Sequence, residues 1–447
     1  MKRLRTLFIP LLLITVTVYG QNKEQQNSAA LKWFTDARYG MFIHWDMSSV
    51  AGTEISWSRK ATKPLDITGD PAGYVEDPNY DNLYKKFNPA KFDATEWVRI
   101  AKEAGMKYIV FTAKHHGGFA MWNTKTSDYS IMNTPYGKDA IKQLAAACHK
   151  AGMKFGLYYS QRDWHNPLYG IGDNKAYINY MNEQIRELLT SYGKIDIIWW
   201  DSYGVGDLEK FWQIGSTYDL VKKLQPDIIM NNRLAVLGDY NKQPARYLGD
   251  WDTPEQTIGK FQNNRLWESC FTLVHTPDGG GWSYRPDGKV HSYAECINAL
   301  VGCATGDGNL LLGIGPDATG VIPADQQERL AQISQWLKKY QESIYGTRGG
   351  PYTNGTWGGA TFKGKKIYLH IRKWNGDSLT LPTLKGKIVK CTNLTNESNR
   401  ATFVQDNKNL TIKLSADKQD SIDTIIMLEL AGDASDELTN GKPIAVK

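Results

Sequence analysis

Short apolar runs alternate with amphipathic helical patterns between about residues 30 and 346 of this 447-residue chain. Such runs predict strands buried on both faces, and the helical patterns between them predict crossover connections. Repeated strand–helix units indicate a parallel sheet covered by helices. Strands are predicted over 39–44, 108–112, 155–160, 195–201, 228–232, 266–273 and 309–314. Seven such strands suit a (β/α)8 TIM-like barrel in which one strand escapes detection.

A short internal sequence repeat supports this strand count. Residues 103–108 read EAGMKY and residues 150–155 read KAGMKF, each just before a predicted strand. In both, the glycine can adopt the left-handed conformation that ends a helix before a strand begins. Helices are predicted over 95–104, 138–151, 176–192, 216–224, 292–304 and 323–342.

The pattern changes after Gly346, where turns rich in glycine, threonine and asparagine separate alternating strands. This spacing predicts a C-terminal antiparallel β-sandwich, with loosely attached hairpins as the alternative. We therefore expect a barrel over 28–346 and a sandwich domain over 347–447. The clearest strands of the second part are 366–371, 387–392, 409–414 and 424–430.

The N-terminus has the features of a secretory signal. Basic residues within the first five positions precede an apolar stretch from Leu7 to Tyr19, and Gly20 offers a small residue for cleavage. The stretch contains Pro10 and is shorter than the roughly 20 residues that a bilayer span needs. We expect residues 1–20 to be removed and the mature chain to be exported without a membrane span, to the periplasm or the medium if the source is bacterial.

Charge and cysteine content exclude several classes of protein. The formal charge falls from +6 to +3 when Lys2, Arg3 and Arg5 leave with the signal, which argues against a nucleic-acid-binding protein. The five cysteines are odd in number and lack CxxC spacing, which argues against a disulfide framework and a zinc site. The 15 tryptophans and 24 tyrosines suit a large core, and flat rings also suit sugar faces.

Polar residues stand at or just after the ends of several predicted strands. The C-terminal ends of barrel strands meet at one face, so these residues become neighbours despite their distant numbers. A single buried histidine is more often a hydrogen-bonded interior residue, but the whole set favours a functional site. Its members are His44, His115, His116, Tyr158, Trp199, Asp201, Arg233 and Glu268.

The adjacent histidines raise the question of a metal. Neighbouring residues of a regular strand point to opposite faces, so His115 and His116 can share a ligand only where the strand breaks into the Gly117-Gly118 loop. No HxH, HExxH or cysteine partner accompanies them. We expect neither a metal nor another cofactor.

Two carboxyl groups are needed to hydrolyse a glycosidic bond, one beside the anomeric carbon and one to protonate the departing oxygen. Asp201 ends the strand IDIIWWD and is the candidate nucleophile. Glu255 lies in a loop that can reach over a substrate at the barrel mouth, whereas Glu268 lies on the next strand. Glu255 is the preferred acid/base, with Glu268 as an alternative or a supporting group.

The same segments resemble the α-L-fucosidases of glycoside hydrolase family 29, which are retaining exo-enzymes with a (β/α)8-like barrel and a C-terminal β-sandwich. The resemblance runs in order through the barrel region. The matching segments are RYGMFIHW (38–45), AKHHGGF (113–119), GLYYS (156–160), IWWD (198–201), NNR (231–233), WE (267–268) and GNLLLGIGP (308–316).

The resemblance implies a role for each matching position. Asp201 corresponds to the nucleophile, and Glu255 lies in the variable loop where the family tends to carry its acid/base. Arg233 matches an arginine placed near the catalytic carboxylates. Implied sugar contacts are His44, His115, His116, Tyr158 and Trp199, with Glu54 and Trp57 as loop contacts. One departure is Gly117, where the family commonly has an aspartate that would support the histidines.

We therefore expect an exo-acting, retaining α-L-fucosidase acting on fucosylated oligosaccharides or glycoconjugates. Histidine, glutamate and tyrosine can pair with the three hydroxyls of fucose, and an aromatic ring can cover its methyl group. The alternatives are a catalytically weak glycan-binding homologue, which Gly117 alone suggests, and the same barrel acting on another sugar such as an α-galactoside. The sequence predicts neither the linkage preference nor the oligomeric state.

Overall fold

A computed structural model describes residues 29–59, 76–201, 208–235, 249–258, 261–396, 398 and 400–446. Its largest sheet has eight strands in the order β5-β4-β3-β2-β1-β10-β7-β6, and the paired strands run parallel. The strands are β1 (Tyr39–Ile43), β2 (Tyr108–Lys114), β3 (Lys154–Ser160), β4 (Ile197–Asp201), β5 (Ile229–Met230), β6 (Trp251–Asp252), β7 (Leu266–Thr272) and β10 (Asn309–Ile314). All seven predicted barrel strands are confirmed.

The eighth strand, β6, has two residues, and its Trp251 lies between charged positions, since Asp250 precedes it and Asp252 follows it, so no apolar run marks the strand; β5 is equally short but lies in the apolar run 228–230. It lies beside β7 and also reaches β5, because Asn231 bridges Trp251 and the Asp250 N–H donates to the Met230 carbonyl at 2.6 Å. These contacts join the two ends of the sheet, so the fold is a (β/α)8-like barrel.

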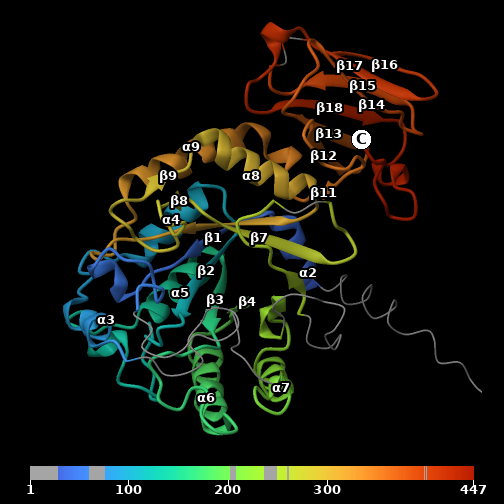
Figure 1. Ribbon diagram of the computed structural model, residues 1–447. Coiled ribbons are helices and arrows are strands. Elements are labelled where there is room, and N and C mark those ends of the chain that lie inside the picture. The colour runs from blue at the N-terminus through green and yellow to red at the C-terminus, as the bar shows by residue number, and fades with distance from the viewer. Residues whose placement is uncertain are drawn as a thin grey trace, which may run out of the picture.

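Helices surround the barrel strands (Figure 1). Gly152 ends α5 with a φ of 66°, and Gly105 follows α4 with a φ of 90°, so both glycines of the internal sequence repeat adopt the left-handed conformation. An unpredicted helix, α2, precedes β1. The helices are α2 (Ala29–Ala37), α3 (Pro78–Asp81), α4 (Ala94–Glu103), α5 (Ala140–Ala151), α6 (Lys175–Ser191), α7 (Ile214–Leu224), α8 (Tyr293–Thr305) and α9 (Ala324–Tyr340).

Large aromatic side chains fill the barrel interior. Phe42, Tyr108, Tyr158 and Trp199 are at most 1% exposed and belong to one apolar cluster. Gly40 makes room for Tyr108, since a Cβ at position 40 would lie 2.4 Å from its ring. This packed interior forms the floor beneath the polar residues at the strand ends.

The C-terminal part forms two antiparallel sheets with a separate apolar core. The larger has the order β11-β12-β13-β18-β15 and the smaller β14-β17-β16. The predicted strands 366–371 and 424–430 coincide with β13 and β18. The strands are β11 (Arg348–Gly349), β12 (Gly358–Lys363), β13 (Lys366–Ile371), β14 (Ser378–Pro382), β15 (Ile388–Asn393), β16 (Thr402–Gln405), β17 (Asn409–Lys413) and β18 (Thr424–Leu430). The predicted antiparallel sandwich is confirmed.

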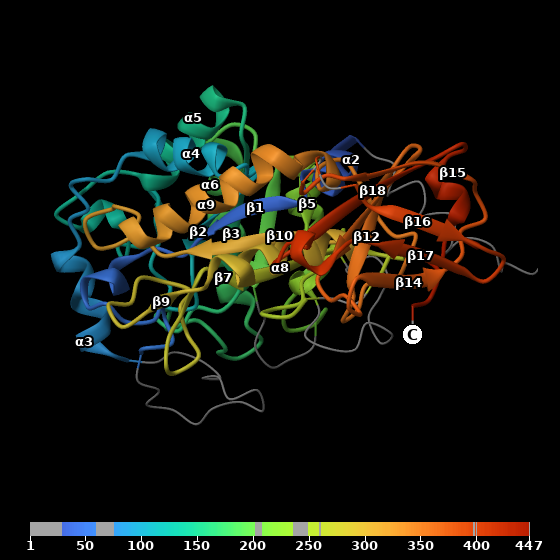
Figure 2. The same cartoon turned by 90° about the horizontal axis from the view of Figure 1, so that it is seen from above.

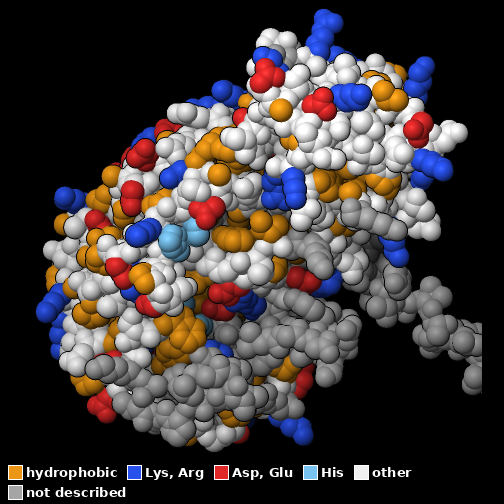
Figure 3. Space-filling view, turned by 45° about the horizontal axis from the view of Figure 1, so that its top comes forward, with side chains coloured by type: hydrophobic (Ala, Val, Ile, Leu, Met, Phe, Trp, Pro, Cys, Tyr) orange, Lys and Arg blue, Asp and Glu red, His pale blue; other side chains and the backbone are white. Residues whose placement is uncertain are grey.

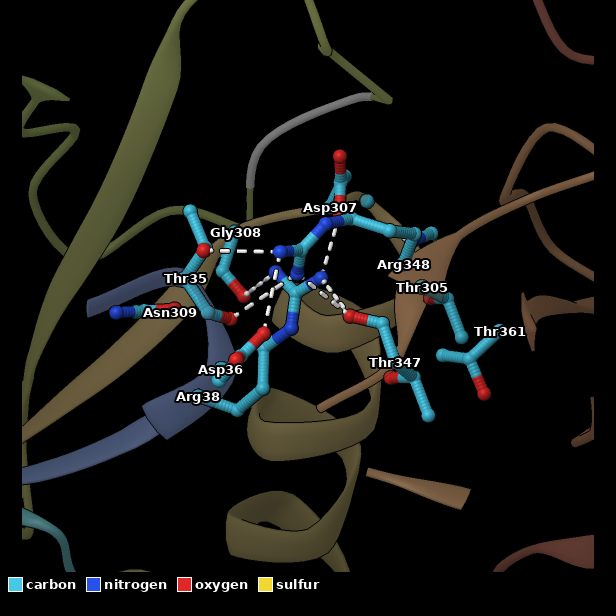
Figure 4. Close-up of polar contacts among 12 residues, drawn as sticks. Thr35, Asp36, Arg38, Thr305, Asp307, Gly308, Asn309, Thr347, Arg348 and Thr361 are labelled. Carbon is cyan, nitrogen blue, oxygen red and sulfur yellow. Dashed lines mark hydrogen bonds and ion pairs between the residues drawn. The ribbon is translucent and has the colours of Figure 1, made fainter. Parts of the chain in front are cut away.

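A network of ion pairs and hydrogen bonds around the buried Arg38 joins the sandwich to the barrel (Figure 4). Arg38, directly before β1, pairs with Asp307 and donates to the Thr347 carbonyl at 2.6 Å. Arg348 of β11 donates to the Thr35 hydroxyl at 2.9 Å. The contacts gather at the N-terminal ends of β1 and β10, and Figure 2 shows the sandwich at one end of the barrel. We propose 28–346 and 347–447 as the limits of the two domains.

The molecular surface carries charges of both signs. Figure 3 shows lysines and arginines interspersed with aspartates and glutamates over both parts of the visible face. No helix in the described part of the chain is long and apolar enough to cross a membrane. The proposed signal, residues 1–20, lies outside the described residues.

Candidate active site

A cavity of ≈ 280 Å³ opens where the barrel strands end. Strand ends and the loops that follow supply its walls, as the barrel geometry predicts. The described residues that line it are Phe42, His44, Trp57, His115, His116, Tyr158, Arg162, Trp199, Asp201, Arg233, Glu255, Cys270 and Trp282. Nine of the residues proposed from the sequence are therefore brought together: His44, Trp57, His115, His116, Tyr158, Trp199, Asp201, Arg233 and Glu255.

Asp201 is the last residue of β4, and both of its carboxylate oxygens are held. Oδ1 accepts from the Arg233 guanidinium at 2.9 Å, and Oδ2 accepts from the Tyr158 hydroxyl at 2.5 Å. Burial alone raises the pKa of Asp201, but the Arg233 charge and the Tyr158 hydrogen bond outweigh it and hold the pKa below the ordinary value. The carboxylate is ionised and fixed in orientation, as a nucleophile requires.

Arg233 connects the two candidate catalytic carboxyl groups. Its Nη1 binds Asp201, and its Nη2 binds Glu255 Oε2 at 2.8 Å. Nε donates to the Thr253 hydroxyl at 2.8 Å, and the guanidinium lies 4.8 Å from the centre of the Trp199 ring. The arginine thus fixes both carboxylates on one side of the cavity.

Glu255 follows β6 by three residues, so it too extends from a strand end. The side chain is 44% exposed, whereas that of Asp201 is 13% exposed. A carboxyl at the mouth can exchange protons with water and reach a leaving group, while the deeper one faces the sugar. The two positions suit different roles in one reaction.

Three histidines also line the cavity. The His115 ring stacks on Tyr158, with centroids 5.3 Å apart and planes at 5°, and His44 contacts the same ring edge-on at 5.4 Å. Burial lowers the pKa of His44 to about 3 and lowers the pKa values of His115 and His116 well below the ordinary value. All three imidazoles are neutral near pH 7 and can both donate to and accept from sugar hydroxyls.

The histidine pair lies just beyond β2, which ends at Lys114. The strand breaks where the sequence predicted, so both rings reach the cavity. Gly117 leaves room for Ser56: its N–H donates to Ser56 Oγ at 2.7 Å, and a Cβ at position 117 would lie 2.9 Å from that oxygen. A bulkier residue at position 117 would conflict with this packing.

Asp163 supplies a buried carboxylate beneath the same loop. It pairs with Lys114 at 3.1 Å, and both side chains are at most 1% exposed. Next to it, the backbone N–H of Trp164 donates to the backbone carbonyl of His116 at 2.8 Å. His116 Nδ1 also lies 2.6 Å from the Ser160 hydroxyl. The histidines are therefore supported from β3 and the segment after it, without an aspartate at position 117.

Glu268, the alternative acid/base, lies inside the barrel and is not among the described residues that line the cavity. It accepts from the Trp199 indole N–H at 3.1 Å and from the Tyr108 hydroxyl. Burial raises its pKa to about 7. Its position suits support of Trp199 better than contact with a leaving group.

Of the two predicted loop contacts, Trp57 lines the cavity and Glu54 does not. Trp57 lines the cavity and is 49% exposed, with its ring edge-on to His116 and Trp164, each 5.3 Å away. The Glu54 carboxylate instead accepts from the N–H groups of Gly281 at 2.7 Å and Ser283 at 3.1 Å. It holds the loop that carries Trp282, so its link to the cavity is indirect.

Sequence reasoning missed four residues of the wall: Phe42, Arg162, Cys270 and Trp282. Phe42 and Cys270 could have been found, because each lies two positions from a chosen residue, His44 or Glu268, in the same predicted strand and so is expected on the same face. Arg162 and Trp282 follow strands in loops, where no periodicity marks which side chains turn inward.

One group of possible metal ligands lies in the cavity. Ligand atoms of His115, His116 and Asp201 lie within 4.8 Å of one another. The imidazoles are neutral, but Asp201 is already paired with a guanidinium, whose positive charge disfavours a cation beside it. The arrangement fits a carboxylate-based reaction better than a metal centre.

A parallel barrel with two fixed carboxylates and neutral hydrogen-bonding groups around one small cavity defines a glycoside hydrolase. A model of the family described as alpha-L-fucosidase matches residues 13–342. The chain belongs to the alpha-L-fucosidase family, glycoside hydrolase family 29.

Relatives of known identity cover most of the chain. An alpha-L-fucosidase of Dictyostelium discoideum is 31% identical over 78% of this chain and 79% of its own. The solved structure of alpha-L-fucosidase isoenzyme 1 from Paenibacillus thiaminolyticus is 30% identical and superposes with a TM-score of 0.76 over 90% of this chain and 99% of its own.

A third structure bears on mechanism. It is a family 29 alpha-L-fucosidase of Bacteroides thetaiotaomicron, trapped as a covalent intermediate with 2-fluoro-fucosyl fluoride. It is 26% identical to this chain, with a TM-score of 0.77 over 91% of this chain and 97% of its own.

Proposed function

We propose that the protein is an exo-acting, retaining α-L-fucosidase that removes terminal α-L-fucosyl residues from glycans. The observation that carries this proposal is the bridge from Asp201 through Arg233 to Glu255 beside three neutral histidines. Retaining enzymes need two carboxyl groups close enough for direct attack, and one shared guanidinium keeps these two together. The covalent intermediate trapped on the Bacteroides relative supports the same course here.

In the first step Asp201 attacks the anomeric carbon, and the bond to the glycosidic oxygen breaks as Glu255 donates a proton to that oxygen. The product is a glycosyl ester on Asp201. In the second step Glu255 removes a proton from water, the water oxygen attacks the anomeric carbon, and Asp201 leaves as a carboxylate. Arg233 keeps Asp201 ionised for the attack and stabilises it when it departs.

The sugar pocket has the groups that a deoxy sugar needs. His44, His115 and His116 offer nitrogens to hydroxyls, and the apolar side chains of Phe42 and Trp282 offer a surface for a methyl group. A cavity of ≈ 280 Å³ suits one terminal sugar residue, which is the basis for exo action.

The nucleophile is tested by Asp201→Ala. We expect the variant to fold and to lose release of an aryl α-L-fucoside, and a fluorinated fucosyl inactivator should label Asp201 in peptide mass spectra of the unaltered protein. A label on another carboxylate would remove Asp201 from the mechanism. Turnover of an aryl α-galactoside above that of the fucoside would favour the related sugar specificity.

The acid/base is tested by comparing Glu255→Ala with Glu268→Ala. Azide can replace water as a nucleophile that needs no general base, so it should restore turnover of an activated aryl fucoside to the Glu255 variant only. Rescue of the Glu268 variant instead would reverse the assignment. Binding of fucosylated glycans without turnover in the unaltered protein would favour the glycan-binding alternative.

We also propose that residues 1–20 direct export. The support is the basic start, the apolar stretch and the small residue at the proposed cleavage point. N-terminal sequencing of protein recovered from an exporting host should begin at Gln21. An intact Met1 terminus on protein retained in the cytoplasm would contradict the proposal.

A further inference from the structure

A second cavity, of ≈ 470 Å³, lies where the outer helices of the barrel meet the sandwich. Helices α8 and α9 form one side, and the segment 420–422 before β18 forms the other. Figure 1 shows these two helices on the side of the barrel nearest to the sandwich. None of the described residues that line this junction cavity also lines the cavity around Asp201.

Three aromatic side chains line the junction cavity. Trp336 and Tyr340 lie one helical turn apart on α9, with ring centroids 5.3 Å apart and planes at 64°, and Tyr293 joins them from α8. Trp336 is buried, whereas both tyrosines are half-buried. Partly exposed rings in a hollow suit the C–H faces of sugar rings.

Polar side chains of α9 and of the segment before β18 surround these rings, and Gln332 Nε2 donates to Glu328 Oε1 at 3.3 Å. Within the described residues, no hydrogen-bond partner is found for the buried Nε of Arg329 or the buried Oε1 of Gln332. Gln335 and Lys339 add exposed polar groups at the rim, and Asp420 faces them from the sandwich side. Amide, guanidinium, ammonium and carboxylate groups together can bind hydroxyls as donors and acceptors.

The two sides of the junction cavity are held in place before any ligand binds. Ile425 and Met427 of β18 belong to the apolar cluster of the barrel, and Ile422 packs against it. Asp420 is fixed because its Oδ1 accepts from the N–H groups of Ile422 at 2.8 Å and Asp423 at 3.0 Å. A preformed site spares a ligand the entropic cost of ordering it.

A sandwich cavity beside Trp357 and Trp374 is a weaker candidate. Both indole N–H groups there are already engaged, that of Trp357 with the Thr353 carbonyl and that of Trp374 with the Thr424 hydroxyl. The junction cavity keeps more of its polar atoms free among the described residues.

We propose that the junction cavity is a second carbohydrate-binding site, which takes a neutral oligosaccharide segment of a larger glycan. The two cations Arg329 and Lys339 and the carboxylate of Asp420 give it mixed charge, which suits hydroxyl groups better than a polyanion. The site keeps the protein on a polymeric glycan while the catalytic cavity acts on chain ends. Binding of a glycan at this site goes beyond the proposed hydrolysis and does not depend on it, whereas the retention of the protein on its substrate rests on the proposed function.

Affinity electrophoresis tests the proposal with neutral polysaccharides that lack fucose, namely defucosylated xyloglucan and galactomannan. We expect retardation of the unaltered protein, and a loss of about tenfold in affinity for Tyr340→Ala, roughly the effect of removing one stacking ring and its hydrogen bond. Gln335→Ala should weaken binding in the same direction. Lys338→Ala is the matched control, because Lys338 is exposed on α9 but does not line the cavity.

Hydrolysis of an aryl α-L-fucoside should be unchanged in all three variants, which separates this site from the catalytic one. Tyr340→Phe keeps the fold and the ring, and should bind more tightly than Tyr340→Ala. Absence of retardation by either polysaccharide would overturn the proposal. So would equal retardation of Tyr340→Ala and the unaltered protein, or binding to a sulfated fucan alone that disappears in salt. Because the probes lack fucose, none of these outcomes bears on the proposed hydrolase activity.

Discussion

Arg233 organises the catalytic cavity at the scale of single residues, because one guanidinium holds both candidate catalytic carboxylates and covers the Trp199 ring. The planar fork of arginine can bind two carboxylates at once, which an ammonium group cannot reproduce. The residue thus couples the charge of Asp201 to the placement of Glu255.

Arg233→Gln should lower kcat/KM for an aryl fucoside by about 100-fold, since it removes a fixed charge from the reacting carboxylates. It should also move the acidic limb of the pH profile. In the unaltered protein Arg233 holds the pKa of Asp201 below its ordinary value, so Asp201 stays ionised to lower pH. Without that charge the pKa rises, and the limb moves to higher pH. A pH–kcat/KM series measures this, and an unmoved limb would show that Asp201 does not control it.

The second prediction concerns the effect of Glu268 on stability. Burial raises its pKa in the folded protein to about 7 from an ordinary value of 4.5, so the folded state holds this proton more tightly than the unfolded state does. Stability from this group is present below about pH 4.5 and is lost as the pH rises through 7. Over this range the loss is about 3 kcal/mol, at 1.36 kcal/mol for each pKa unit.

Glu268→Gln is neutral at every pH and should remove this dependence. The free energy of unfolding of the variant, relative to the unaltered protein, should therefore improve between pH 5 and pH 8. Urea denaturation at both pH values measures the difference, with Glu96→Gln on the exposed face of α4 as the control. A difference that stays constant with pH would mean that Glu268 is ionised throughout.

At the scale of elements, the end of β2 shows how a strand and a loop build the sugar pocket together. Lys114 is the last residue of the strand, and its pair with Asp163 ties it to the segment after β3. That segment in turn holds His116 through the Trp164 N–H. The Lys114–Asp163 ion pair therefore helps to hold both histidines in place.

Asp163→Asn should destabilise the fold by about 3 kcal/mol or more, because it leaves the buried Lys114 ammonium without a counter-charge. KM for an aryl fucoside should rise as the histidine loop loosens. Asp173→Asn, in the exposed turn before α6, is the control and should change neither quantity. Chemical denaturation and steady-state kinetics measure the two effects. Unchanged stability would contradict the importance of the buried pair.

At the scale of the whole molecule, the sandwich contributes side chains to the apolar core of the barrel. Tyr368, Ile425 and Met427 of the sandwich belong to the main apolar cluster of the barrel. Arg38 and Asp307 add a buried ion pair at the same junction. The two parts are therefore expected to unfold together.

Arg38→Leu should lower the free energy of unfolding by about 3–5 kcal/mol, because it removes the arginine that pairs with the Asp307 carboxylate and donates to the Thr347 carbonyl. Calorimetry should show one transition at a lower temperature. Lys32→Ala, which breaks an exposed pair with Asp36, is the control and should cost less than about 1 kcal/mol. Two separate transitions in the unaltered protein would contradict coupled unfolding.

Sequence and structure agree most closely where the information is local. The long strands were predicted because buried parallel strands are continuous apolar runs, and helix ends were predicted from the glycines at 105 and 152. The strand β6 was missed because Asp250 and Asp252 flank Trp251 and leave no apolar run. The choice of Glu255 over Glu268 as acid/base stays a prediction, but the structure puts the first at the cavity and the second beneath it.

The sequence by itself determined the barrel, the sandwich and the strand ends that carry Asp201 and the histidines, because periodicity and strand termini are properties of short segments. Only the tertiary structure decided which loops meet above the barrel. It turned Glu54 toward the backbone at 281–283, brought Trp282 and Arg162 into the wall, and joined Asp201 to Glu255 through Arg233. The physical reason is that such contacts depend on distances between segments far apart along the chain, which local patterns do not encode.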